Sequence, residues 1–266
     1  MGRVPPALLM KGPAMDQTAW RQVTIDYPGV SREQREHQAV AHLTRVLPTA
    51  DSDGRIAAWF FIRKGPWRIR YLLADPSGTD TVQPLLTSNV RWTRDIYEPE
   101  VHAFGGAEAM EAAHALFHGD SRNLLPYLGQ NPTDRPERSL VLLTALMRGA
   151  GLELNEQGDV WANVAAQRTE KLAARPTSAS WTSYISGVRH LLVGEARADL
   201  VGADWLSAYE GGGLALRSLR RSGSLTRGIR TIIALHVIFA WNRLGLPAST
   251  QALLAKAAAE AVFGRE

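Results

Sequence analysis

The sequence predicts an α+β fold, with a mixed sheet and a hairpin in the N-terminal half and a mainly helical C-terminal half. Strand-like alternation of apolar and polar residues occurs within residues 20–97, whereas helical periodicity prevails from about residue 107 onward. Strands that come first and helices that come later are typical of α+β folds, because a doubly wound sheet alternates the two.

The N-terminal half begins with a strand and a helix. Residues 20–27 (WRQVTIDY) alternate apolar and polar side chains, as a half-buried strand does. Ser31 and Gln34 have the spacing of a capping box, so we expect a helix to begin after Ser31. We expect this helix to end at Leu47, because Pro48 follows it.

Three further strands are expected before the helical half. Residues 55–64 and 67–75 are two apolar runs separated only by Gly65 and Pro66, a pattern that predicts a hairpin. Residues 91–97 (RWTRDIY) supply the third strand.

The C-terminal half is predicted to be a set of helices. Helical periodicity covers residues 107–118, 120–128, 137–149, 155–174, 180–193, 224–244 and 250–263. We interpret the glycines at 211–213 and the RRSGS sequence at 220–224 as a flexible connection. Residues 1–19 are expected to be a basic, flexible extension, and residues 20–266 a single domain.

Composition excludes several kinds of site. The 266 residues contain no cysteine, which excludes disulfides, thiolate nucleophiles and cysteine-based metal sites. No stretch approaches the roughly 20 apolar residues of a membrane helix, and the N-terminus lacks a secretory core, so we expect a cytoplasmic protein. The net charge of +4 suits an acidic peptide, a carboxylate-bearing substrate or RNA; alternatively, it reflects a coding preference for arginine.

Two arginines on one predicted strand form the first candidate site. Arg68 and Arg70 alternate with apolar residues, so their guanidinium groups share one face of the strand. Residues two apart in a strand are separated by roughly 6.5–7 Å, and two guanidiniums at that spacing can grip one carboxylate or two neighbouring oxyanions. The alternative is a solvated polar face of an edge hairpin.

The second candidate site is the segment IYEPEVHAFGG at residues 96–106. Pro99 ends the preceding strand, so Glu98, Glu100 and His102 lie on a short connection at the end of the sheet. Connections of this kind often carry catalytic side chains. The alternative is the ordinary polarity of a loop.

The third candidate is His236, which lies inside an apolar helix with Arg243 near the end of the same helix. A lone histidine in such a helix is more often a core residue than a catalytic one, and Arg243 either binds substrate or caps helix carbonyls. His114 and His118 have a spacing that can seat a metal, but without a third ligand we expect a solvated or half-buried pair. Dinucleotide-binding, P-loop, HExxH and GxSxG motifs are absent from the sequence.

Three segments in order, WFFIRKGPWRIRYLL, IYEPEVHAFGGAEAMEAAHALFHGDSR and LHVIFAWNRLGLP, resemble the thiopeptide-type bacteriocin biosynthesis domain. That domain is similar to the C-terminal glutamate-elimination domain of lantibiotic dehydratases, and the resemblance extends from about Trp20 to Phe263. It implies a stand-alone enzyme that eliminates glutamate from glutamylated Ser or Thr of a ribosomally made precursor peptide, leaving dehydroalanine or dehydrobutyrine. It also implies a leader on that peptide, a separate glutamylating partner, and no metal or organic cofactor. The sequence itself contains no aromatic-basic RNA-binding motif, so we expect no direct binding of nucleic acid.

The resemblance further implies a catalytic set. Arg68 and Arg70 match the family's arginine pair, Glu100 matches its glutamate, and His236 matches its late-helix histidine. In the implied mechanism the arginines hold the glutamate carboxylate and the developing negative charge, and the histidine moves the proton. Glu100 orients an arginine or carries a second proton. A further family arginine, three residues after the glutamate, is replaced here by Ala103.

The substitution at Ala103 leaves the reaction open. Lys64, Arg91 and Arg94 are the nearest candidates to supply the missing charge and bind substrate. The resemblance also extends to aza-[4+2] cyclases, which join two dehydroalanines into a pyridine or piperidine ring and have lost elimination residues. A third alternative is a non-catalytic subunit that binds the leader peptide, for example by adding a strand to the sheet.

Overall fold

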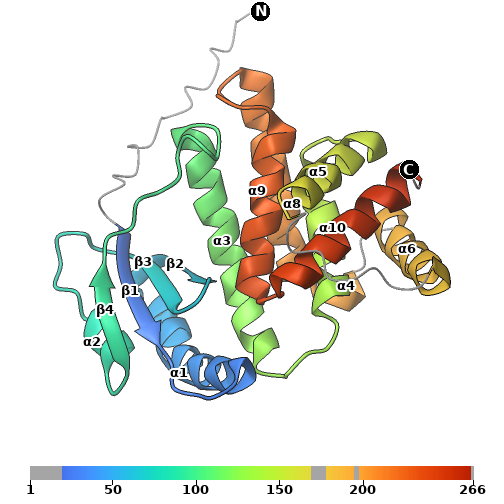
Figure 1. Cartoon of the computed structure of the whole chain (residues 1–266). Coiled ribbons are helices and arrows are strands. Elements are labelled where there is room, and N and C mark those ends of the chain that lie inside the picture. Colours follow the sequence, from blue (N-terminus) through green and yellow to red (C-terminus); the bar gives the residue numbers. More distant parts are fainter. Residues whose placement is uncertain (1–19, 169–177, 195–197, 265–266) are drawn as a thin grey trace, which may run out of the picture.

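The computed structural model describes residues 20–168, 178–194 and 198–264, so the expected N-terminal extension at 1–19 lies outside the described residues. The elements in chain order are β1 (Trp20–Asp26), α1 (Arg32–Ser52), β2 (Ile56–Arg63), β3 (Trp67–Leu73), α2 (Gln83–Thr87), β4 (Arg91–Asp95), α3 (Ala107–Leu128), α4 (Arg135–Gly149), α5 (Leu154–Ala166), α6 (Ser178–Val193), α7 (Ala198–Val201), α8 (Ala203–Ser222), α9 (Ile229–Leu244) and α10 (Ala248–Phe263). The strands gather on one side of the molecule, and α3 stands between them and most of the later helices (Figure 1). The predicted α+β class is confirmed.

The four strands form one sheet in the order β2-β3-β1-β4. The β2–β3 hairpin is confirmed. All three strand pairings are antiparallel, so the expectation of a mixed sheet is wrong in this detail. The reason is that the hairpin places β3 between β1 and β2. These two strands therefore run in the same direction without pairing to one another.

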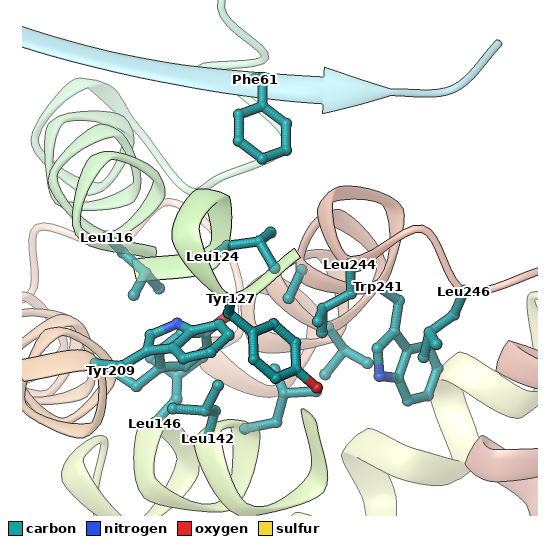
Figure 2. Packing of buried hydrophobic residues seen from close by; sticks show 14 of the residues in the cluster. Phe61, Leu116, Leu124, Tyr127, Leu142, Leu146, Tyr209, Trp241, Leu244 and Leu246 are labelled. Atoms are coloured by element: carbon teal, nitrogen blue, oxygen red, sulfur yellow. The ribbon is translucent and has the colours of Figure 1, made fainter. Parts of the chain in front are cut away.

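The two faces of the sheet pack against different parts of the molecule. Phe61 of β2 belongs to the larger core, and Figure 2 shows its ring directed toward Leu124 of α3. Phe60, the next residue back along β2, points to the opposite face and packs with Phe117 of α3. The smaller apolar cluster on that second face contains Trp20, Phe60, Ile62, Leu72, Tyr97, Phe104, Met110, Ala113 and Phe117.

β4 forms an exposed edge of the sheet. It pairs with β1 on one side, and all five of its residues are exposed to solvent. The other edge strand, β2, is buried along most of its length, because α3 covers it. The open edge and the second face of the sheet therefore meet solvent together at β4.

The first helix is longer than the sequence predicts. α1 continues through Pro48 to Ser52, so the expectation that it ends at Leu47 is wrong. Leu47 and Ala50 are both buried on either side of the proline, and this packing outweighs the hydrogen bond that proline removes. The predicted start is confirmed, because Ser31 Oγ accepts a hydrogen bond from the backbone N–H of Gln34 at 3.1 Å.

Glycines inside helices allow close helix packing in this fold. α8 runs through the glycines at 211–213, so their interpretation as a flexible connection is wrong. A Cβ at Gly213 would collide with the carbonyl oxygen of Leu146 in α4, which explains why this helix contact requires glycine. α3 is likewise one helix across Gly119, where a Cβ would lie 2.9 Å from the Cβ of Ala208 in α8.

Other differences between the predicted and the observed helices lie at the helix ends. α9 begins at Ile229, five residues later than the predicted residue 224, and residues 223–228 form the turn that joins it to α8. α5 ends at Ala166, and residues 169–174 of the helix predicted there lie outside the described residues. The short helix α2 was not predicted. Within the part of the chain that the structure describes, no helix has the length and apolarity needed to cross a membrane.

Candidate active site

Arg70 begins a polar row that crosses the second face of the sheet through Gln22 to Asp95. Its Nε donates a hydrogen bond to Oε1 of Gln22 on β1 at 2.6 Å. The amide of Gln22 in turn donates to Oδ2 of Asp95 on β4 at 2.5 Å. The row follows from strand register, because Gln22 lies opposite both Arg70 and Asp95. Arg70, Gln22 and Asp95 are therefore fixed relative to one another by three adjacent strands.

Two aromatic rings hold the guanidinium of Arg70 from the helical side. Its Cζ lies 4.1 Å from the ring centroid of Tyr97 and 5.4 Å from that of Phe60. Such cation–π contacts keep a partly desolvated guanidinium in place without neutralising its charge. Burial lowers the pKa of Arg70, and the neighbouring Arg68 acts in the same direction, whereas Tyr97 and Glu100 oppose the shift.

Arg68 lies on the same face as Arg70, as strand alternation predicts. It is half-buried and, among the described residues, has no hydrogen bond or ion pair. Its neighbours across the sheet are Ile62 on β2 and Thr24 on β1, neither of which carries charge. The pair Arg68 and Arg70 therefore presents positive charge that no carboxylate of the described residues contacts directly.

Glu100 lies on a tight turn between β4 and α3. The backbone N–H of Phe104 donates to the carbonyl of Glu100 at 3.0 Å, and that of Gly106 donates to the carbonyl of Val101 at 2.9 Å. Gly106 has a φ of 114°, a conformation that favours glycine. The carboxylate of Glu100 is exposed and close enough to act electrostatically on Arg70. The structure therefore brings Arg68, Arg70 and Glu100 into one region.

His236 is buried among aromatic rings. It is 2% exposed, and neither ring nitrogen has a hydrogen-bond partner in the described structure. Its ring centroid lies 5.1 Å from that of Phe104 and 5.8 Å from that of Phe117. Burial lowers the pKa of His236 to about 3, and Arg243 adds to the effect, so the imidazole is neutral. His236 is as buried as a core residue, but it lacks the hydrogen bonds that a buried polar group usually makes.

An aromatic layer connects His236 to the arginine pair. Phe117 contacts His236 and also Phe60, whose ring centroid is 5.3 Å away. Phe60 in turn contacts the guanidinium of Arg70. Phe104 belongs to the same turn as Glu100, so one turn carries both the candidate carboxylate and an aromatic ring that packs against His236.

Tyr97 and His114 form a buried pair that the sequence analysis missed. The hydroxyl of Tyr97 and Nε2 of His114 are 2.8 Å apart, and the ring of Trp20 lies 4.6 Å from that of His114. Burial raises the pKa of Tyr97 to about 12 and lowers that of His114 to about 4. The expectation that His114 and His118 are solvated or half-buried is wrong for His114, which is buried, and confirmed for His118, which is half-buried and accepts a hydrogen bond at Nδ1 from the backbone N–H of Trp59 at 3.1 Å. The helical spacing of His114 with Met110 and Phe117, both apolar, was the signal for its burial.

A pocket opens beside this region at the start of β1 and the end of β4. Its volume is about 530 Å³. Gln22, Asp95, Tyr97 and Glu98 line it together with Arg94, one of the predicted substrate contacts. The polar row and the Tyr97 ring therefore border a space large enough for part of a peptide side chain.

The other predicted cations lie in different surroundings. Lys64, Arg91 and Arg94 are exposed and have no ion pair among the described residues. Arg243 is fully buried, and its Nε donates to Oδ2 of Asp120 at 2.5 Å. The ion pair joins α9 to α3 in the protein interior. Because Arg243 is buried there, it is not one of the proposed substrate contacts.

A cation that the sequence did not indicate lies next to Ala103. Nη1 of Arg227, in the turn between α8 and α9, donates to the carbonyl of Ala103 at 3.2 Å. The two residues are 124 positions apart in the sequence, so sequence spacing gave no signal for this contact.

Acidification is expected to destabilise the fold through its buried histidines, above all His114 and His236. The folded-state pKa values of His114 and His236 are about 4 and about 3, below the usual value of about 6.5. As the pH falls below about 6.5, the unfolded chain binds protons at both positions and the folded chain does not, so the free energy of unfolding decreases. Each histidine should contribute about 1.4 kcal/mol per pH unit until its folded pKa is reached.

Urea denaturation at neutral pH and at about pH 5 measures this effect. The variant His236→Leu should lose a substantial part of the acid sensitivity, because it removes one of the two histidines whose pKa is lowered to about 4 or below. The exposed residue His37 provides the control, since His37→Leu makes the same exchange without removing a buried histidine. Equal sensitivity in the wild-type protein and the His236 variant would contradict the assignment.

Comparison with known proteins places these observations in a family context. Residues 20–262 match the family model described as "Lantibiotic biosynthesis dehydratase C-term". No curated protein matches the sequence. Among solved structures, MibB, a tRNA-dependent lantibiotic dehydratase from Microbispora sp. 107891, is 18% identical with a TM-score of 0.58. The similarity covers 98% of this chain but 29% of the MibB chain, so this chain spans less than a third of that protein.

Two smaller proteins share the fold over most of their length. TsrL is 14% identical with a TM-score of 0.56, and the similarity covers 92% of this chain and 98% of TsrL. TbtD, a pyridine synthase from thiomuracin biosynthesis, is 14% identical with a TM-score of 0.59, covering 92% of this chain and 97% of TbtD.

Proposed function

The chain belongs to the family of lantibiotic dehydratase C-terminal domains, and from this premise we propose that it matures a ribosomally made peptide by eliminating glutamate. In this reaction a base removes the Cα proton of a glutamylated serine or threonine. The electron pair of that C–H bond forms the Cα=Cβ bond, the Cβ–O bond breaks, and glutamate leaves as the carboxylate through which it was esterified. The products are dehydroalanine or dehydrobutyrine and free glutamate.

The observation that carries the proposal is the arginine pair Arg68 and Arg70. The two guanidiniums share a face, and no ion pair with the described residues neutralises them. A glutamate esterified through one of its carboxyl groups retains the other as a free carboxylate, and elimination adds negative charge at the substrate carbonyl. Preorganised arginines stabilise both charges, and such donors are effective because they need no rearrangement during the reaction. Gln22 and Tyr97 hold Arg70 in position for this role.

His236 is the proposed proton carrier. A general base must be unprotonated before it acts, and burial keeps this imidazole neutral. Its two unpartnered nitrogens leave it free to accept a proton. Because the residue is 2% exposed, the substrate reaches it only when the turn that carries Glu100 and Phe104 shifts away. Binding of substrate at Glu100 and the arginines is the proposed cause of that shift.

The second candidate is ring formation from two dehydroalanines. The observation that favours it is Ala103, which stands where the elimination enzymes that this sequence resembles carry an arginine. TbtD, whose fold this chain shares, is a pyridine synthase. Against this candidate, Arg68, Arg70, Glu100 and His236 are all retained. We therefore place elimination first.

Two substrates offered in parallel distinguish these functions. One is a precursor peptide that carries a glutamylated serine; the other is the same peptide with two dehydroalanines already in place. We expect free glutamate and a dehydroalanine from the first peptide, detected by mass spectrometry, because the complete arginine pair supports that reaction. Ring formation from the second peptide, with the first untouched, would replace elimination by cyclisation. Binding of both peptides without reaction would leave a non-catalytic subunit.

A further inference from the structure

Positive charge is strongly segregated in the last quarter of the chain. No aspartate or glutamate occurs between Glu210 and Glu260. The same stretch contains seven basic residues, namely Arg217, Arg220, Arg221, Arg227, Arg230, Arg243 and Lys256. Five of these arginines fall within residues 217–230, where α8 ends and α9 begins. The fold therefore concentrates positive charge at one junction between two helices.

This junction borders a groove of about 950 Å³, which we call the basic groove. One wall is α5 and the other is the α8–α9 turn with the start of α9. Its described lining consists of Glu156, Asp159, Ala162, Asn163, Arg220, Gly223, Leu225, Arg227, Gly228, Ile229, Arg230 and Thr231. It is separate from the pocket at Gln22 and Tyr97, with which it shares no described residue.

Two of its arginines lack a carboxylate partner among the described residues. Arg230 forms an ion pair with Asp159. Arg227 has a neutral partner, the carbonyl of Ala103, and Arg220 is exposed with no hydrogen bond or ion pair of its side chain in the described structure. The carboxylate of Glu156 accepts a hydrogen bond from the backbone N–H of Glu153 at 3.0 Å, which commits it to the start of α5. The groove therefore retains unneutralised positive charge.

We propose that the basic groove binds an acidic segment of the peptide substrate, at a distance in sequence from the residue that is modified. Carboxylate side chains pair well with guanidiniums, which form charge-assisted hydrogen bonds to them. The apolar side chains of Leu225 and Ile229 add contact area for a peptide. The inference rests on the proposed function, because it assigns this segment to the peptide being matured.

The lining favours a peptide over RNA. The described lining carries three arginines against Glu156 and Asp159, fewer free cations than the several phosphate contacts on which binding of a nucleic-acid backbone depends. The described lining also contains no aromatic side chain, although stacking on aromatic rings is the usual means of holding single-stranded bases.

The groove is joined to the candidate active site through the turn at residues 98–106. Arg227 donates to the carbonyl of Ala103, and the backbone N–H of Thr226 donates to the carbonyl of Gly105 at 3.0 Å. These bonds connect the α8–α9 turn to the turn that carries Glu100. A peptide segment held by Arg227 would therefore bind a side chain that is hydrogen-bonded to the turn whose shift is proposed to uncover His236.

Fluorescence anisotropy with the full-length protein tests the proposal. The probes are a labelled synthetic peptide rich in aspartate and glutamate, and its counterpart with asparagine and glutamine at the same positions. We expect the acidic probe to bind and the neutral probe to bind about tenfold more weakly or not at all, as two lost charge-assisted contacts imply. The variant Arg220→Gln should weaken binding of the acidic probe, and Arg220→Gln with Arg227→Gln should weaken it further.

Arg45 of α1 supplies the matched control, since it is exposed and lies outside the groove. Arg45→Gln should leave affinity unchanged. The charge swap Arg220→Glu, combined with a probe in which lysine replaces one acidic residue, should restore part of the lost affinity. Equal affinity for both probes, or equal loss in the Arg45 and Arg220 variants, would overturn the proposal. Tighter binding of a single-stranded RNA oligonucleotide at the same arginines would overturn it in favour of nucleic acid.

Failure of this inference and failure of the proposed function are separable. Binding of the acidic probe needs no turnover, and glutamate release from a glutamylated peptide needs no acidic segment in principle. If elimination occurs while the Arg220 variants bind the acidic probe normally, the groove assignment fails alone. If the probe binds at Arg220 while neither offered substrate reacts, the reaction assignment fails alone.

Discussion

Replacement of His236 by glutamine should lower the rate of glutamate release about 10²–10⁴-fold, the usual contribution of a positioned general base. Binding of the glutamylated peptide should change little, because Arg68 and Arg70 remain to hold the glutamate. The reason is chemical: glutamine cannot accept the Cα proton, although it fills much of the same volume. Mass spectrometry of the peptide over time gives the rate, and anisotropy of a labelled peptide gives the affinity.

His42 provides the matched control for this variant. It is also a buried histidine, 7% exposed, but it lies on α1 and its Nδ1 is 2.8 Å from the hydroxyl of Tyr27. His42→Gln should cost stability without affecting the rate of glutamate release. Thermal unfolding of both variants separates loss of fold from loss of chemistry. An unchanged rate in the His236 variant would make this residue a packing residue only.

Replacement of Asp120 by alanine should lower the free energy of unfolding by about 3–5 kcal/mol, as expected when one partner of a buried ion pair is removed. Oδ2 of Asp120 accepts from Arg243 at 2.5 Å, and Oδ1 accepts from Nε1 of Trp205 at 2.7 Å. The side chains of Asp120 and Arg243 are 0% and 1% exposed. The variant therefore leaves a buried guanidinium without its counter-ion. Urea denaturation monitored by tryptophan fluorescence measures the loss.

An exposed aspartate provides the comparison. Asp53 pairs with Arg55, and both side chains are 42% exposed. Asp53→Ala should cost no more than about 1 kcal/mol, since surface ion pairs contribute little. Similar losses in the Asp53 and Asp120 variants would show that burial does not govern the contribution of the Asp120 pair.

The fold was predictable where its signals are local. Alternating or continuous apolar side chains predicted the four strands, and Gly65 with Pro66 predicted the hairpin. Ser31 gave the start of α1, because a capping hydroxyl bonds within three residues of itself. The errors at Pro48 and at the glycines of 211–213 have a common cause. Both depend on contacts with distant helices, which outweigh local propensity and leave no trace in the surrounding sequence.

The candidate site likewise contains features that local sequence predicts and features that depend on tertiary structure. Strand alternation placed Arg68 and Arg70 on one face, and that placement needs no knowledge of the rest of the chain. The pairing of Tyr97 with His114 and the contact of Arg227 with Ala103 required the tertiary structure, since each joins different elements. Burial of His236 was expected from its apolar helix. Its missing hydrogen bonds were not, because partners for a buried side chain come from other parts of the fold.

The open edge at β4 also bears on how the protein behaves at high concentration. An unpaired strand edge is a template for another strand, and proteins that expose one risk joining edge to edge into aggregates. Arg91, Arg94 and Asp95 occupy three of the five positions of β4. Pairing of two such edges would strip water from these charged side chains, which is costly. The charged edge thus lets the molecule keep a free strand in solution while discouraging polymerisation through it.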